Sequence, residues 1–474
     1  MAPNQPIRYT NGPLLLDHLQ HPYRSLAVVF GIWKAVLLGI ASLATLAGPA
    51  YDTSGDLLGT IVSNKSISNP PGHPIPCGGL VSRLVSWDAI YFTQAARRGR
   101  LYEQEWAFGT ALPTVVSFFH GQLGILGAEF PIPVIAVVYA HIAHLLAVLL
   151  LYHLGCRLWL GTAGRTLAYV AACLHILSPA GLFLSAPYAE GSCAFFSFAG
   201  YVAFAAGRRA DLGAPSVNGD LLRLLAGLFF GTATLFRSNG LLSGIVFAYE
   251  AVAGSLAFLR QPNFPLFRRL VSVGLGGLLV AAGTVVPQTV AYMQFCQAPS
   301  GVPGEEYRSW CTARLPSIYN FVQEHYWGSG RLLNYWTLSN MPLFVLAMPM
   351  LLIMGKSSID FWMPAATSTR SPVKKDAKPT AAQQEVVGSM LDPRQVTLVQ
   401  CMAAIQMLLA IMAFANYHVQ IVYRLSSAYP VWYWWIAQGL MGGPRLKLSS
   451  GIVVFMIMYA SIQGILFASF LPPA

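Results

Sequence analysis

Charged side chains are scarce in this chain of 474 residues. Asp, Glu, Lys and Arg together make up 10% of it, while hydrophobic residues make up 55%. An ordinary soluble domain carries roughly 25% charged residues, and a soluble chain of this length would need several charged surfaces. The composition therefore excludes an ordinary soluble protein and predicts one that crosses a membrane several times.

The signatures of several soluble protein classes are also missing. The seven cysteines show no CxxC or Cys/His spacing, which argues against a zinc site. No GxGxxG, Walker A, HExxH or GxSxG pattern stands in a supporting context, so we expect no chemistry on soluble nucleotides. The net charge of +11 does not indicate nucleic acid, because Lys and Arg are scattered through short loops.

What the chain has in abundance is apolar stretches near the ~20 residues that cross a bilayer. The first, 25–50, is too long for a signal peptide and is followed by others. The pattern predicts one all-α, polytopic membrane domain over 1–474, with a bundle of about eleven transmembrane helices. The expected spans are 25–50, 131–155, 166–187, 189–207, 222–237, 240–259, 271–296, 337–355, 397–416, 427–442 and 451–471.

The loop charges orient this bundle. With a cytosolic N-terminus, the loops on the cytosolic side hold 18 Lys and Arg and the opposite loops hold 10, as the positive-inside rule requires. The far side then carries the loops 51–130 and 297–336. Trp, Tyr and acidic residues predict that 51–130 folds against the membrane surface, whereas the Ser/Thr/Pro/Lys-rich segment 357–396 predicts a disordered cytosolic linker.

Polar residues gather on the far side, where an ionisable group at membrane depth usually marks a cavity or a functional site. Asp88 is either a first-turn acid that complements a helix dipole or a catalytic carboxylate. Glu190 either reaches the surface at a hairpin or faces a cavity, and Arg237 either extends outward to the surface or holds a phosphate. The residues alone leave these alternatives open. Further candidate binding residues are Trp87, Tyr91, Glu103, Glu105, Tyr188, Asn239, His325, Tyr326, Trp327 and Arg424.

Acids, arginines and aromatic rings on one face suit a substrate carried in the bilayer, with its phosphate on an arginine. Such a donor favours an inverting sugar transfer, in which a carboxylate deprotonates the acceptor hydroxyl while the lipid phosphate leaves. The competing hypothesis is a transporter or flippase for a lipid-linked sugar, with Lys34, Glu250 and Arg237 along a pathway. Against it, the sequence has no repeated halves, and its polar residues crowd one face. An inactive scaffold subunit is a third possibility.

Five strings, in this order, resemble the PIG-V family of GPI mannosyltransferases, and the resemblance spans about 15–470 apart from the linker. They read "WDAIYF…RGRLYEQEWAF", "PAGLFLSAPYAE", "ATLFRSNGLL", "LPSIYNFVQEHYWGSGRLLNYWTLSNMP" and "RLSSAYPVWYWW". The chain departs from the family's usual "AFFP" at 107–113, which puts the geometry of that loop in question.

The resemblance implies a GT-C-type fold in the endoplasmic reticulum membrane, with a lumen-facing active site. It implies transfer of the second, α1,6-linked mannose from dolichyl-phosphate-mannose to mannosylated glucosaminyl-phosphatidylinositol, with Asp88 as general base. A small accessory membrane subunit is a further implied partner. Another polyprenyl-phosphate-sugar transferase with a different acceptor remains the alternative.

Three smaller features bear on a luminal location and on cofactors. Asn64 heads an Asn-Lys-Ser glycosylation sequon in the first far-side loop. Cys296 and Cys311 flank the start of the 297–336 loop, so they are a candidate disulfide in an oxidising lumen. Asp88 with Glu103 or Glu105 offers oxygen ligands to a divalent ion, but the spacing does not form a convincing acidic pair, so no metal ligand is assigned.

Overall fold

The computed structural model describes residues 19–52, 79–128, 130–211, 213–297, 308–328, 332–362, 391–442 and 445–471. Within these ranges every regular element is a helix, so the predicted all-α class is confirmed. Asn64 lies outside the described residues, and the use of its sequon therefore stays a prediction.

Eight helical segments in the described ranges are long and apolar enough to cross a membrane. They are α1 (Pro22–Ala47), α6 (Ile132–Leu158), α9 (Val217–Phe236), Ser238–Arg260 with α10 (Gly244–Arg260), α11 (Phe264–Cys296), Leu338–Trp362 with α13 (Met341–Trp362), Pro393–Ala415 with α15 (Val396–Ala415), and α18 (Leu446–Ala468). The other three predicted spans overlap α7 (Gly161–Ile176), α8 (Glu190–Ala210) and α17 (Val431–Leu440), but the span 166–187 continues well past the end of α7. The chain is thus a multi-pass membrane protein.

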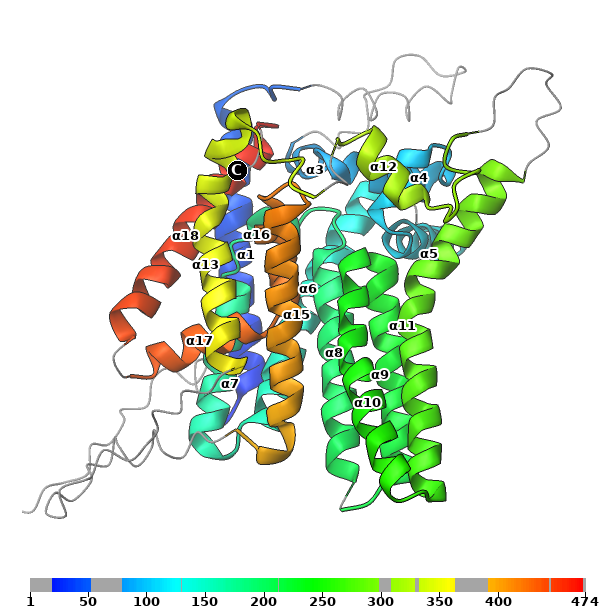
Figure 1. Cartoon of the computed structure of the whole chain (residues 1–474). Helices are drawn as coiled ribbons and strands as arrows, with labels where there is room; N and C mark the ends of the chain where they lie inside the picture. Colours follow the sequence, from blue (N-terminus) through cyan, green and yellow to red (C-terminus); the bar gives the residue numbers. More distant parts are fainter. Residues whose placement is uncertain are drawn as a thin grey trace, which may run out of the picture.

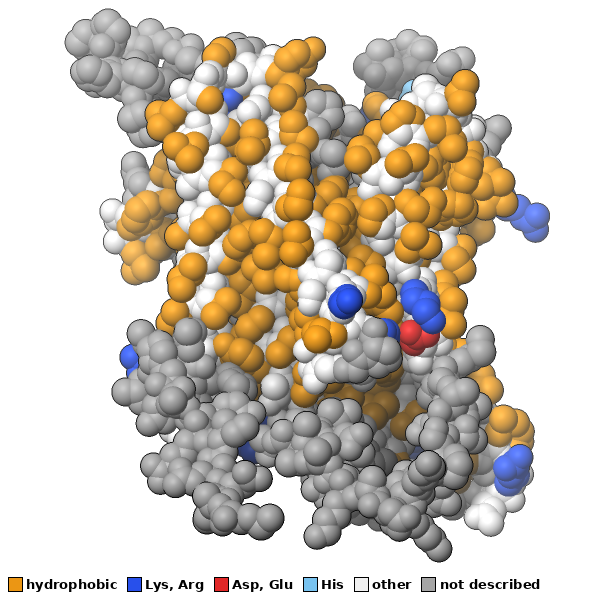
Figure 2. All heavy atoms as spheres, turned by 90° about the vertical axis from the view of Figure 1, so that its left-hand side faces the viewer, with side chains coloured by type: hydrophobic (Ala, Val, Ile, Leu, Met, Phe, Trp, Pro, Cys, Tyr) orange, Lys and Arg blue, Asp and Glu red, His pale blue; other side chains and the backbone are white. Residues whose placement is uncertain are grey.

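The long helices run side by side, and four shorter helices gather at one end of the bundle (Figure 1). There lie α3 (Leu80–Leu84), α4 (Asp88–Arg98), α5 (Ala111–Ile125) and α12 (Ile318–His325). We call this the cavity end. The described parts of the predicted loops 51–130 and 297–336 therefore lie on the same side of the protein, as the loop charges predict. Hydrophobic side chains cover most of the middle of one face (Figure 2), as lipid contact demands.

Glycines allow the closest helix packing. A Cβ on Gly227 of α9 would lie 2.6 Å from Gly276 of α11, and one on Gly283 would lie 2.4 Å from the carbonyl oxygen of Gly231. Only residues without a side chain let two backbones approach so closely, which is a common device of membrane helix pairs. The α9–α11 pair thereby forms a rigid wall below the segment that carries Arg237.

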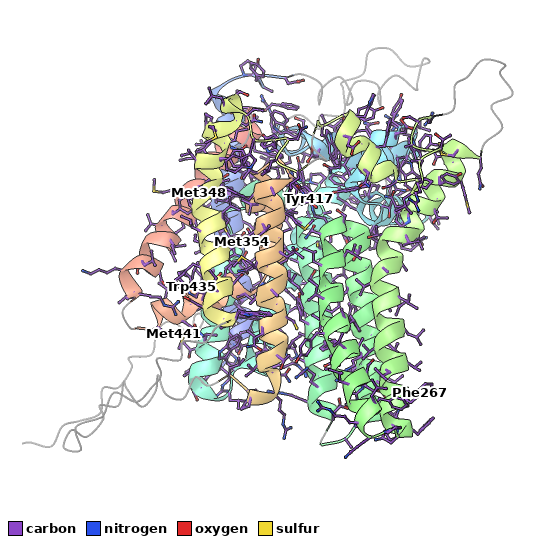
Figure 3. The ribbon with its side chains drawn as sticks, viewed as in Figure 1. Phe267, Met348, Met354, Tyr417, Trp435 and Met441 are labelled. Carbon is purple, nitrogen blue, oxygen red and sulfur yellow. A yellow bond between two sulfur atoms is a disulfide. The ribbon has the colours of Figure 1, made fainter. Side chains whose placement is uncertain are left out.

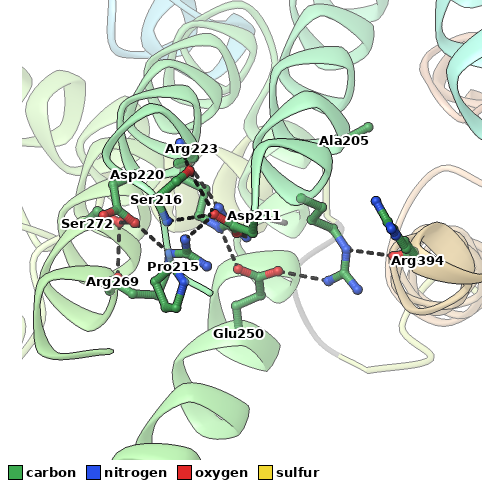
Figure 4. A network of polar contacts seen from close by, with 12 residues as sticks. Ala205, Asp211, Pro215, Ser216, Asp220, Arg223, Glu250, Arg269, Ser272 and Arg394 are labelled. Atoms are coloured by element: carbon green, nitrogen blue, oxygen red, sulfur yellow. Dashed lines mark hydrogen bonds and ion pairs between the residues drawn. The ribbon is translucent and has the colours of Figure 1, made fainter. Parts of the chain in front are cut away.

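The opposite end of this wall is closed by ion pairs between α8, α9, α10 and α11 (Figure 4). Arg223 Nε is 2.7 Å from Glu250, and Arg269 Nε is 2.6 Å from Asp220. Each carboxylate has a guanidinium partner, which compensates the cost of removing these charges from water. Glu250, proposed above as part of a transport pathway, is therefore occupied in a structural network.

The predicted linker 357–396 is wrong at both ends. Helix α13 continues to Trp362, because its polar residues bond within the helix. The Ser357 hydroxyl donates to the Ile353 carbonyl, and Asp360 pairs with Lys356 one turn earlier. At the other end Leu391 forms an antiparallel bridge with Trp159. Residues 363–390 lie outside the described residues.

Candidate active site

Asp88 is the first residue of α4, and the residue before it has an unusual backbone. Trp87 has φ 59°, in the left-handed region that non-glycine residues rarely adopt, and its indole packs on Phe470 with ring centroids 5.1 Å apart. No side chain caps the helix. The Asp88 carboxylate is 30% exposed, and its Oδ2 accepts a hydrogen bond from Arg424 Nη1 at 2.9 Å. Among the described residues, the hydrogen-bond partner of this carboxylate is thus Arg424 and not a backbone N–H of the first helical turn.

Glu190 begins α8, just after the bend at Pro187. Its side chain has no exposed surface, so the alternative that it reaches the surface at a hairpin is wrong. One oxygen, Oε1, accepts from both Arg237 Nη1 at 2.7 Å and Arg424 Nε at 2.8 Å. A buried carboxylate therefore holds two arginines, from the end of α9 and from α16 (Ile421–Leu425), beside each other.

Arg424 is the common partner of both carboxylates. Its guanidinium carbon lies 4.5 Å from the ring centre of Phe183 and 4.6 Å from that of Tyr188, so aromatic faces also stabilise the cation. Burial lowers the pKa of Arg424, but Glu190 and Asp88 outweigh it, so the pKa is raised above its ordinary value. Arg424 is a permanent cation of the site.

Asp88, Arg237 and Arg424 all line one cavity of about 470 Å³ at the cavity end. Its glycine, Gly109, has φ +81°, and a Cβ there would lie 2.3 Å from the carbonyl oxygen of Phe236. The neighbouring Thr110 N–H donates to Leu235 O at 2.9 Å. The loop whose sequence departs from the family pattern is therefore fastened to the end of α9, next to Arg237, and only glycine fits there.

Several predicted residues are brought together and others are not. Those that line the cavity are Trp87, Asp88, Tyr188, Arg237, Asn239, Trp327 and Arg424. Glu190 lies directly behind them, bonded to the two arginines. Tyr91 lies one layer away, stacked on the cavity residue Phe108 with ring centroids 5.0 Å apart. Asn239 Nδ2 donates to Tyr429 Oη at 3.1 Å, which fixes the amide at the cavity wall.

The predicted binding residues Glu103, Glu105, His325 and Tyr326 are not among the residues that line the cavity. Glu105 is held 2.6 Å from Arg98 and accepts the backbone N–H groups at 101 and 102, so it shapes the loop. Glu103 accepts from the Trp310 indole at 2.7 Å. His325 stacks on Phe321, and Tyr326 is 48% exposed. These contacts give the four residues partners or positions outside the cavity wall, and their predicted substrate-binding role stays a prediction.

The disulfide considered from the sequence, Cys296–Cys311, is present. Trp310 and Cys311 pack with Trp106, Ile318 and Val322 in a small separate core. This core connects α12 to η2 (Glu103–Phe108) and to the end of α11. The disulfide and Glu103 therefore position α12, whose Tyr319 and Gln323 line the cavity.

Sequence reasoning assigned no binding role to a second set of lining residues. These are Tyr319, Gln323, Tyr335, Tyr417, His418 and Gln420. All six lie in or beside two aromatic-rich strings, which an interfacial belt also explains. Tyr417 lies at the cavity end, just beyond α15 (Figure 3). Burial and the nearby Arg424 lower the pKa of His418, although Asp88 partly opposes them.

Among the described residues, no group of three or more His, Cys, Asp or Glu could hold a metal ion. Asp88, Arg237 and Arg424 are charged groups that line the cavity, and the buried Glu190 behind them bonds both guanidiniums. Guanidinium forks are suited to phosphate and carboxylate oxygens. Chemically, the arrangement offers one partly exposed carboxylate beside two anion-binding cations and several aromatic rings.

Comparison with known proteins gives matches along most of the chain. The family model "Mannosyltransferase (PIG-V)" matches residues 75–474. A protein of Chaetomium globosum named "GPI mannosyltransferase 2" is 46% identical over 499 residues, covering 100% of both chains. A protein of Cricetulus griseus named "GPI alpha-1,6-mannosyltransferase 2" is 29% identical and covers 78% of this chain and 76% of its own. A crystal structure of the Archaeoglobus fulgidus oligosaccharyltransferase aligns with a TM-score of 0.40 and 13% identity, over 95% of this chain and 56% of its own.

Proposed function

The chain belongs to the PIG-V family of mannosyltransferases, and we propose that it adds the second, α1,6-linked mannose to a GPI precursor in the endoplasmic reticulum membrane. The donor is dolichyl-phosphate-mannose and the acceptor is mannosylated glucosaminyl-phosphatidylinositol. The names of two relatives support a GPI acceptor, and the name of the one matched over 78% of this chain supports the α1,6 linkage. The single observation that carries the chemistry is the cavity lined by Asp88, by its partner Arg424 and by Arg237.

In the proposed reaction Asp88 accepts the proton of the acceptor hydroxyl. The acceptor oxygen attacks C1 of mannose as the bond from C1 to the phosphate oxygen breaks, and the transfer inverts C1. Arg237 and Arg424 bind the phosphate, because charge-assisted bonds to its oxygens strengthen as negative charge develops on the leaving group. The aromatic rings of Trp87 and Trp327 offer faces for the sugar rings.

The cavity end is proposed to face the lumen and the N-terminus the cytosol, in accordance with the loop charges. The disulfide between Cys296 and Cys311 at this end supports the orientation, since such bonds persist in oxidising compartments. An epitope tag at the N-terminus should be accessible in sealed microsomes without detergent. Protection of that tag would reverse the assignment. A small accessory subunit is a further proposed partner, which co-purification in mild detergent would test.

Two features disfavour a transporter. Lys34 donates to the Leu184 carbonyl at 2.9 Å and to Ser185 Oγ at 2.7 Å, and Glu250 pairs with Arg208 and Arg223. Both groups, proposed above as parts of a pathway, are bonded inside the protein. The polar cavity also lies at one end of the bundle, whereas transporters place their binding sites near the bilayer midplane.

The test is mannose transfer by the purified full chain, given dolichyl-phosphate-mannose and acceptors that carry one or two mannoses. We expect an α1,6-linked product from the one-mannose acceptor alone. Asp88→Asn should remain folded but lose transfer, because the amide cannot accept the proton. Product from the two-mannose acceptor would favour a related transferase with a different acceptor, and normal turnover by Asp88→Asn would refute its role as base.

A further inference from the structure

Arg424 contacts the two carboxylates through different nitrogens. Its Nε is 2.8 Å from Glu190 Oε1, and its Nη1 is 2.9 Å from Asp88 Oδ2. Glu190 has no exposed side-chain surface, whereas Asp88 is 30% exposed and lines the cavity. The Nε side of the guanidinium is therefore anchored in the protein interior, and the Nη1 side reaches the cavity.

The contact between Arg424 and Asp88 conflicts with what the proposed reaction needs from each residue. An Asp88 oxygen that accepts a guanidinium hydrogen bond is less available to the acceptor hydroxyl. A guanidinium nitrogen that bonds Asp88 is likewise unavailable to the donor phosphate. The two roles therefore compete for Asp88 Oδ2 and Arg424 Nη1, and breaking this one contact releases both atoms.

We propose that the phosphate of the lipid donor draws the Nη1 side of Arg424 away from Asp88, so that the carboxylate becomes available as base only when the donor is bound. This inference rests on the proposed function and adds an order of events to it, with the donor bound before the acceptor is deprotonated. Glu190 is a positioning residue, because it retains the Nε side of Arg424 and also Arg237 during the exchange. The rings of Phe183 and Tyr188, 4.5 and 4.6 Å from the guanidinium carbon, pack against the part of the cation that stays in place.

The charges balance through the step. Asp88 and Glu190 carry two negative charges, and Arg237 and Arg424 carry two positive ones. When the C1–O bond breaks, its electron pair leaves with the phosphate, whose charge changes from −1 to about −2. The proton of the acceptor hydroxyl neutralises Asp88 at the same time, so the total charge is unchanged. Arg424 then faces a neutral Asp88 and stays with the phosphate.

The test measures binding of dolichyl phosphate, the leaving group, to the purified full chain in detergent. Asp88→Asn should bind it about fivefold more tightly than the wild type, because the competing partly exposed charge pair has been removed. The affinity for uncharged dolichol should not change, since dolichol has no phosphate. In an Arg424→Gln background, Asp88→Asn should give no gain. If Arg424→Gln does not fold, Arg424→Lys replaces it and should reduce the gain, because an ammonium lacks the guanidinium fork.

Arg445→Gln is the matched control, because Arg445 also pairs with an aspartate, Asp360, but this pair lies outside the cavity. Asp360 keeps Lys356 as a second partner when Arg445 is replaced. That variant should bind dolichyl phosphate with wild-type affinity. An unchanged or weaker affinity in Asp88→Asn, or an equal gain without Arg424, would overturn the inference. If the wild type still transfers mannose from dolichyl-phosphate-mannose, such a result rejects the exchange and leaves the proposed function standing. Absence of that transfer would instead reject the function itself.

Discussion

Replacement of Glu190 by Gln should destabilise the protein strongly. Glu190 is fully buried and compensates two arginines through one oxygen, at 2.7 and 2.8 Å. Removal of one partner from a buried ion pair costs about 3–5 kcal/mol. Arg424 keeps Asp88 as a partner, and Arg237 is 16% exposed and faces the cavity, so both cations retain some compensation. We therefore expect a loss near the lower limit, about 3 kcal/mol.

The size of the new side chain separates this loss of charge from a loss of packing. Gln has almost the volume of Glu, so the substitution should leave no cavity. The NH2 of the new amide replaces one of the two carboxylate oxygens. At Oε1 it would face two guanidiniums that also donate, and at Oε2 it would be buried where no hydrogen bond is made within the described part of the chain. An unsatisfied or opposed donor results in both cases, at a further cost of about 1–3 kcal/mol. Glu190→Asp keeps the charge and should be milder.

The assay is reversible unfolding in mixed detergent micelles, followed by tryptophan fluorescence, with the free energy of unfolding compared between variants. Glu103→Gln is the matched control, because its charged partner Arg308 is 45% exposed and the Gln amide oxygen can still accept from the Trp310 indole, so we expect a loss of less than about 1 kcal/mol. Equal stability of Glu190→Gln and the wild type would refute the argument that this carboxylate holds the site together. The folded fraction should also show a much lower kcat/KM for mannose transfer, since both phosphate-binding arginines lose their anchor.

Three further predictions follow from the loop, the disulfide and a histidine. Gly109→Ala should lower both stability and mannose transfer, because the new Cβ would lie 2.3 Å from a backbone carbonyl oxygen. Gly127→Ala is the control: Gly127 has a similar positive φ but open space around it, so the substitution should lower the free energy of unfolding by only roughly 1 kcal/mol. The double variant Cys296→Ser, Cys311→Ser removes a disulfide that spans 15 residues, and its free energy of unfolding should be lower by about 3 kcal/mol. Limited proteolysis near 308–325 should become faster, and an unchanged digestion rate would contradict this prediction. Burial and a neighbouring arginine lower the pKa of His418. Below about pH 6.5 the unfolded chain therefore binds a proton at this histidine that the folded protein does not bind, and the free energy of unfolding decreases as the pH is lowered. His418→Gln should flatten part of that fall, and an unaltered pH dependence of unfolding would contradict the assignment.

The sequence predicted the spans well because a bilayer imposes a simple requirement. Each apolar stretch near ~20 residues must satisfy its own backbone, and a helix does so. The three shorter helices were found by the same pattern, but whether each of them crosses fully depends on packing. The ends of 357–396 were mispredicted because polar residues such as Ser357 bond backbone within the helix, which composition does not reveal.

For the site, the sequence indicated Asp88, Arg237 and Arg424 because charged residues are rare in such a chain. It could not tell those that line a cavity from those that support it. Glu105 accepts backbone N–H groups three and four residues earlier, a local capping pattern that the string "YEQE" carries. No pattern in the sequence predicts that one arginine joins carboxylates 336 and 234 residues away, because that contact depends on how α16 packs.

The fixed ends of the segment 363–390 have a practical consequence for handling the protein. On one side, Asp360 of α13 bonds the indole of Trp435 at 2.8 Å; on the other, Asp392 accepts from Arg209, and its N–H donates to the Leu158 carbonyl. Because both anchors lie in the folded protein, added chain between them costs little, about 0.6 kcal/mol for each doubling of length. A fluorescent protein or purification tag inserted there would leave the cavity at the other end of the bundle untouched, and would give the detergent-purified enzyme a handle far from its substrates.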